Sequence, residues 1–89
     1  MRSAKEINNR IRRCEKAIEM GRVSPMSEVY ALFMDEINEL QISLVKGEGY
    51  VRASYNDLKG KYSDIPSVYI ENDLDRNRLI LYRWLLKGK

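Results

Sequence analysis

The sequence holds few of the side chains that enzymes use for chemistry. Histidine is absent and Cys14 is the single cysteine, which removes the usual metal-ligand sets and the Ser-His and Cys-His nucleophile pairs. The carboxylate pairs Asp35/Glu36 and Asp73/Asp75 could transfer protons, but no feature of the sequence indicates the burial that would tune their pKa values. No glycine-rich phosphate-binding motif occurs. We therefore expect a protein that is not an enzyme, with no metal, no cofactor and no small-molecule substrate.

The length of 89 residues predicts a single domain spanning residues 1–89. A chain of this size buries only about 60–65% of its unfolded surface, so its core is marginal and a homodimer is a reasonable expectation. One cysteine excludes an intramolecular disulfide and suits a reducing compartment. No apolar run approaches the length of a membrane span. The expected location is the cytoplasm, or the host cytoplasm if the protein is viral.

Residues 3–46 predict a pair of antiparallel helices. Ser3 and Glu6 form a capping-box pattern at the start of the first helix, and Gly21 is a natural stop. Ser24 is the expected N-cap of the second helix, with Pro25 at its first position. The link between the helices is short, which favours antiparallel packing. The apolar face of the first helix comprises Ile7, Ile11, Cys14 and Ile18, and the heptad seam of the second comprises Met26, Tyr30, Phe33, Ile37, Leu40 and Leu44.

Residues 50–87 predict a second half with a different pattern. Apolar positions at helical spacing indicate a helix over residues 50–62, and the sequence SDIP then breaks the chain. Pro66 can start the next helix. The apolar run RLILYRWLL at residues 78–86 fits either a terminal helix or a strand paired with residues 50–55. We predict the all-α class, with an α+β fold carrying a C-terminal β-hairpin as the alternative.

Residues 55–76 resemble the helix-turn-helix of bacterial and phage regulators. Leu58 and Tyr62 match the core of the first helix, Ile65 matches the apolar turn position, and Ile70 and Leu74 match the second helix. The resemblance implies a DNA-binding regulator built as a helical hairpin with a helix-turn-helix-like half. It also implies base or phosphate contacts from Ser67 and Asn72 in the second helix.

The charges are distributed unevenly along the chain. Residues 49–75 carry three basic and five acidic side chains, whereas residues 76–89 carry five basic and no acidic ones. Binding to nucleic acid depends largely on Lys and Arg at phosphates, and the two chain ends would form one basic face if their helices lay side by side. The cations expected to contact nucleic acid are Arg10, Arg12, Arg13, Lys16, Arg76, Arg78, Arg83, Lys87 and Lys89.

Two functions fit this pattern. The first is a small nucleic-acid-binding regulatory protein of bacterial or phage type. The alternative is a protein-interaction module that inhibits or adapts a larger protein without contacting nucleic acid. In that case the acidic segment, with Tyr69, Glu71 and Asp75, would be the protein interface. The salt dependence of binding to generic DNA separates these two hypotheses, because only phosphate contacts release counterions.

Overall fold

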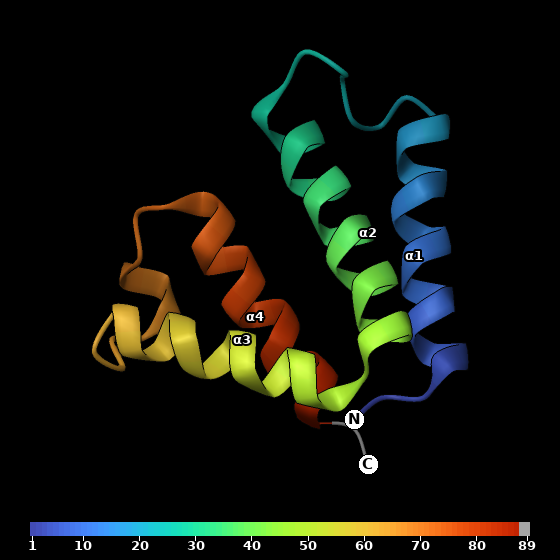
Figure 1. Cartoon of the computed structure of the whole chain (residues 1–89). Helices are drawn as coiled ribbons and strands as arrows, with labels where there is room; N and C mark the ends of the chain where they lie inside the picture. Colours follow the sequence, from blue (N-terminus) through green and yellow to red (C-terminus); the bar gives the residue numbers. More distant parts are fainter. Residues whose placement is uncertain (88–89) are drawn as a thin grey trace.

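The computed structural model describes residues 1–87, and over these residues the chain forms α-helices, one 3₁₀ turn and no strand (Figure 1). The predicted all-α class is confirmed. The β-hairpin alternative is wrong, because residues 50–55 lie in the third helix and residues 76–87 lie in the fourth. The elements are α1 (Ala4–Glu19), α2 (Glu28–Lys46), α3 (Glu48–Lys61), the 3₁₀ turn η1 (Ser67–Tyr69) and α4 (Asp73–Lys87).

Helix α1 begins and ends at the residues that local signals predict. The Ser3 hydroxyl accepts from the Glu6 N–H at 3.2 Å, and the Glu6 carboxylate accepts from the Ser3 N–H at the same distance. These bonds satisfy two backbone donors that the first turn leaves unpaired. Gly21 follows the helix with a φ of 71° and donates its N–H to the Ile18 carbonyl. That left-handed conformation costs glycine little, which explains why the helix stops there.

Helix α2 begins later than the sequence predicts. Its N-cap is Ser27, and Ser24 and Pro25 lie outside the helix. The Ser27 hydroxyl also donates to the Ser24 carbonyl at 2.8 Å, so the two serines close a turn of their own. Met26 therefore falls outside the packing seam and is 94% exposed, which corrects its predicted burial.

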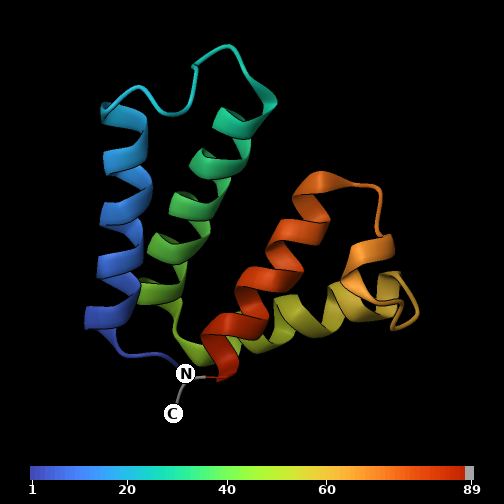
Figure 2. The ribbon, with the colours of Figure 1, turned by 180° about the vertical axis from the view of Figure 1, so that it is seen from behind.

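Helix α2 is the centre of the arrangement, with α1 antiparallel beside it and α4 on its other side (Figures 1 and 2). Gly47, with a φ of 79°, turns the chain sharply from α2 into α3, which packs along α4. The molecule measures 37 × 30 × 16 Å. Several large apolar side chains nevertheless reach the surface, among them Met26, Val45, Val68 and Tyr69.

The segment joining α3 and α4, residues 62–72, differs from the predicted turn and second helix. No α-helix starts at Pro66, whose ψ of 137° is extended, and only η1 forms before α4 begins at Asp73. Two causes are local. Ser63 and Asp64 adopt positive φ values of 52° and 60°, and the Asn72 side chain caps α4 by accepting from the Asp75 N–H at 3.0 Å.

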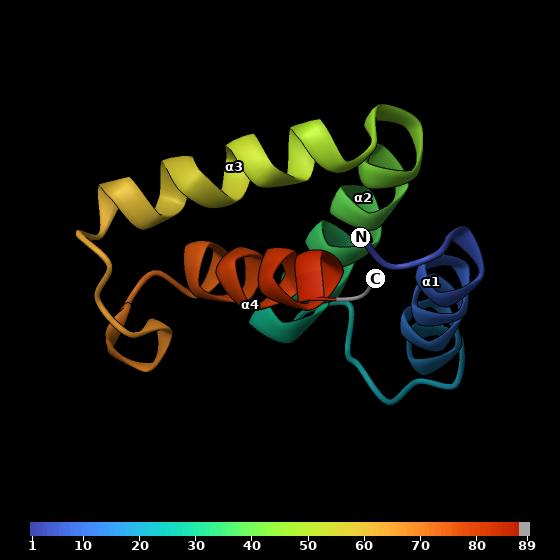
Figure 3. The same ribbon diagram turned by 90° about the horizontal axis from the view of Figure 1, so that it is seen from below.

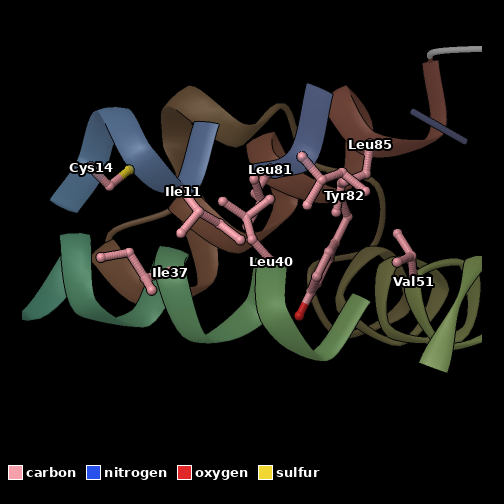
Figure 4. Close-up of a cluster of buried hydrophobic side chains, with 9 residues drawn as sticks. Ile11, Cys14, Ile37, Leu40, Val51, Leu81, Tyr82 and Leu85 are labelled. Carbon is pink, nitrogen blue, oxygen red and sulfur yellow. The ribbon is translucent and has the colours of Figure 1, made fainter. Parts of the chain in front are cut away.

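The core lies where α1, α2 and α4 meet, with α3 closing one end (Figure 4). Leu40 and Leu85 are fully buried. Within the predicted seam, Tyr30, Phe33 and Leu44 are only partly buried. The buried cluster comprises Ile7, Ile11, Cys14, Ile37, Leu40, Val51, Leu81, Tyr82 and Leu85.

Candidate nucleic-acid interface

The fold brings the basic N-terminal end of the chain to the last turns of α4 (Figure 3). The Arg2 N–H donates to the Leu85 carbonyl at 2.8 Å, and the Arg2 Nε donates to the Trp84 carbonyl at 2.9 Å. The guanidinium carbons of Arg2 and Arg10 lie 4.7 and 4.6 Å from the centroid of the Trp84 ring. Each such cation–π contact contributes about 0.5–1 kcal/mol at a partly exposed site. Trp84 therefore holds two arginines from the other end of the chain.

Two hollows share Arg13, and Trp84 lines the larger of them. The larger, about 530 Å³, is lined by Arg2, Glu6, Asn9, Arg13 and Trp84. The smaller, about 340 Å³, is lined by Arg10, Arg13, Cys14, Phe33 and Glu36. Among residues 1–87, Arg13 makes no ion pair, whereas the carboxylates in the two walls, Glu6 and Glu36, are paired with Arg2 and Arg10.

Three of the predicted nucleic-acid contacts are instead paired within the protein. Arg10 binds Glu36 through two hydrogen bonds of 2.9 and 3.3 Å. Arg78 likewise makes a bidentate pair with Asp35, with hydrogen bonds of 2.9 and 2.6 Å. The Asp35 carboxylate raises the pKa of Arg78. Arg76 donates to the Ile70 carbonyl and pairs with Asp73. These pairs neutralise the charges, and two of them tie α1 and α4 to α2, so most of this charge is not free for phosphates.

Ser67 and Asn72, which the sequence predicts to contact phosphates or bases, have roles within the fold. Ser67 is buried in η1, and the Asn72 side chain is committed to capping α4. Ser67 lies in η1 and Asn72 directly precedes α4, because the helix predicted from Pro66 begins only at Asp73. The Asn72 residue is exposed, but its side-chain oxygen is used by the cap.

The remaining predicted cations are exposed and make no ion pair within residues 1–87. Arg12 and Arg13 are consecutive on α1 and Lys16 follows one turn later, and we call these three residues the α1 basic strip. On α4, Arg83 precedes Trp84 and Lys87 follows it by one turn. Lys89 lies outside the described residues.

The three residues of the predicted protein interface do not all lie on the surface. Tyr69 is 74% exposed and Glu71 is exposed, but Asp75 is buried. Asp75 accepts hydrogen bonds from the Tyr62 hydroxyl and from the Lys61 ammonium, the latter at 2.9 Å. Asp75 therefore holds the 62–72 segment against α4, while Tyr69 and Glu71 project from it.

The hydrogen bond from Tyr62, followed by the bond and charge of Lys61, holds the pKa of Asp75 below its ordinary value of 3.8. The unfolded chain therefore binds a proton at Asp75 that the folded chain does not, and stability should fall as the pH drops below about 4. Asp75→Asn should lower stability near neutral pH and reduce the difference in urea midpoint between about pH 7 and about pH 3. An unchanged difference would show that Asp75 does not carry this effect.

Cys14 is a packing residue here. Its thiol donates to Glu36 at 3.1 Å, and burial together with that neighbouring carboxylate raises the pKa of the thiol to about 12. The thiolate, which is the reactive form, is therefore scarce at neutral pH.

Sequence reasoning missed two groups that the fold assembles. One is Arg2 with Trp84, and the other is Glu39, a buried carboxylate bound by the hydroxyls of Tyr50 and Tyr82. The tyrosines were a sequence signal for the Glu39 group, because a buried tyrosine hydroxyl needs a hydrogen-bond partner. Pairing either tyrosine with Glu39 required the packing of α2, α3 and α4.

No protein-family model matches the chain, and comparisons with curated proteins and with solved structures find no match. Within residues 1–87, no helix is long and apolar enough to cross a membrane. Across the same residues, no group of three or more His, Cys, Asp or Glu side chains is placed to hold a metal ion.

Proposed function

We propose that this protein is a non-enzymatic binding protein that holds nucleic acid by its phosphate backbone, without reading base edges. The observation that carries this proposal is the meeting of the two basic chain ends around Trp84. Arg2 and Arg10 contact its ring and Arg13 shares the hollow beside it. Both guanidinium groups also bind carboxylates, Arg2 to Glu6 and Arg10 to Glu36, so they position Trp84, and Arg13 is the cation at this hollow that makes no ion pair within residues 1–87.

The charge available to phosphates comes from the exposed cations that have no internal partner. The α1 basic strip supplies three of them, and Arg83 and Lys87 supply two more on α4. Contacts to phosphates position a protein on nucleic acid but carry no sequence information. Because Asn72 and Ser67 are occupied within the fold, the proposed binding is independent of sequence.

The direct test compares two labelled duplexes of unrelated sequence and one single strand, by fluorescence anisotropy at about 50 mM salt. The proposal expects saturable binding to all three, with dissociation constants for the two duplexes that agree within about threefold, since each base-specific contact would separate them by at least 1 kcal/mol. A much larger preference for one duplex would mean that base edges are read and would contradict this proposal.

A protein-binding role is the second candidate, and a separate observation favours it. Val68 and Tyr69 are 76% and 74% exposed at the tip of the 62–72 segment. This tip is firmly held, since Asp75 binds Tyr62 and Arg76 donates to the Ile70 carbonyl at 2.8 Å. A preorganised loop that displays an aromatic and an aliphatic side chain has little entropy left to lose on docking. Absence of binding to any of the three oligonucleotides would favour this candidate.

A further inference from the structure

A buried carboxylate lies at the junction of α2, α3 and α4, on a different part of the molecule from Trp84. The Glu39 side chain belongs to a residue that is only 5% exposed. Its Oε1 accepts two hydrogen bonds, one from the Tyr50 hydroxyl at 2.9 Å and one from the Tyr82 hydroxyl at 2.5 Å. Both tyrosine protons therefore point at one oxygen of the same carboxylate.

The second oxygen, Oε2, has no hydrogen-bond partner among the described residues. Within that part of the chain, no fully buried side-chain nitrogen or oxygen lacks a partner, so Oε2 must be reached by solvent. The opening is a cavity of about 220 Å³ lined by Glu39, Tyr50, Ser54, Asp57, Arg78 and Tyr82. A residue that is more than nine-tenths buried thus presents an unpartnered oxygen to this cavity.

The groups around the cavity include two carboxylates, from Glu39 and Asp57, and one cation, Arg78, that is already paired with Asp35. A carboxylate oxygen can accept about two hydrogen bonds, and the Tyr50 and Tyr82 hydroxyls have already donated their protons to Glu39. Burial raises the pKa values of both tyrosines, so these protons stay in place at neutral pH. Asp57 adds an exposed carboxylate without an ion-pair partner in residues 1–87. Arg78 is the cation in the wall, and it is bound to Asp35.

We propose that this cavity, which we call the Glu39 pocket, binds the cationic end of a primary amine or a guanidine. Oε2 and Asp57 supply the acceptors and the negative charge that an ammonium or guanidinium group requires. A cavity of about 220 Å³ is smaller than the roughly 300–1,000 Å³ that drug-sized ligands need, and it suits a group the size of one side chain. The ligand is a cation, so this pocket is independent of the proposed phosphate contacts.

An NMR titration with methylguanidinium chloride and with n-butylammonium chloride tests the pocket, using sodium chloride at equal ionic strength as the control. We expect saturable shifts of the backbone amides of Tyr50, Ser54, Asp57 and Tyr82 that sodium chloride does not reproduce. Shifts that grow linearly without saturating, or that sodium chloride reproduces, would overturn the proposal.

Variants identify the groups responsible. Glu39→Gln should weaken binding of methylguanidinium about tenfold or more, because it removes a charge-assisted hydrogen bond. Asp57→Asn should weaken it by a smaller factor, and its exposed position makes it safe for the fold if Glu39→Gln does not fold. Glu71→Gln removes one exposed negative charge from the 62–72 segment, outside the pocket, and should leave binding unchanged. Equal losses in Asp57→Asn and Glu71→Gln would overturn the proposal.

A blocked Gly-Arg-Gly peptide distinguishes the two sources of such a cation. Binding of the peptide as tightly as methylguanidinium would assign the pocket to an arginine side chain of a protein partner. Binding of methylguanidinium alone would assign it to a small free cation. Both results support a cation site, whereas no saturable binding of methylguanidinium, n-butylammonium or the peptide would overturn it.

Discussion

Leu40→Ala is expected to lower the free energy of unfolding by about 2–5 kcal/mol. Leu40 is fully buried in the middle of α2, and the residues around it come from α1 and α4 as well. The substitution leaves a cavity that the surrounding structure fills only partly. A domain of this size has a total stability of about 4–13 kcal/mol, so urea unfolding should show a large loss.

Val45→Ala is the matched control on the same helix. Val45 is 86% exposed, so its truncation should change stability by no more than about 0.5 kcal/mol. Phe33→Ala should fall between the two, because Phe33 is only partly buried. A loss in Val45→Ala as large as that in Leu40→Ala would mean that α2 presents a different face to α1 and α4.

Reversing two charges of the α1 basic strip is expected to weaken nucleic-acid binding about a hundredfold at about 50 mM salt. The double variant Arg13→Glu and Lys16→Glu removes two phosphate contacts and adds repulsion at the hollow beside Trp84. Both side chains are exposed and have no ion-pair partner in the described part of the chain, so the fold should tolerate the change. Anisotropy titrations of the variant and the wild type measure the ratio of dissociation constants.

Lys46→Glu with Arg52→Glu is the control for that experiment, because it makes the same change in net charge on exposed residues of α2 and α3. We expect the control to weaken binding by much less than the α1 variant. Equal losses would indicate a general effect of net charge and would leave the surface around Trp84 without a special role.

Local signals predicted the elements whose causes are themselves local. Ser3 and Glu6 define the start of α1 because the capping box needs only four consecutive residues. The predicted start of α2 was wrong because Ser24 and Ser27 are both good N-cap residues. The choice between them depends on the turn that they form together. The segment after Pro66 was predicted as helix from the spacing of Ile70 and Leu74, although Ile70 adopts an extended conformation.

In the candidate site too, the sequence predicted the features with local causes and missed those that depend on packing. The unequal charge along the chain predicted that the two ends could form a basic face, and Arg13 and Trp84 do line one hollow. The sequence could not show that Arg10 would pair with Glu36, or that Arg78 would pair with Asp35, because each pair joins residues far apart in the chain. The Glu39 pocket was hidden for the same reason, since three helices contribute to it.

The measurement that tests the proposed function most directly is the salt dependence of binding to a generic DNA duplex. Five exposed cations are available, in the α1 basic strip and at Arg83 and Lys87. If all five contact phosphates, the plot of log Kobs against log salt concentration should have a slope of about −4.5, and two or three contacts would give about −2 to −3. We expect measurable binding at low salt with a slope in this range. No binding at low salt, or a slope near zero, would contradict the account.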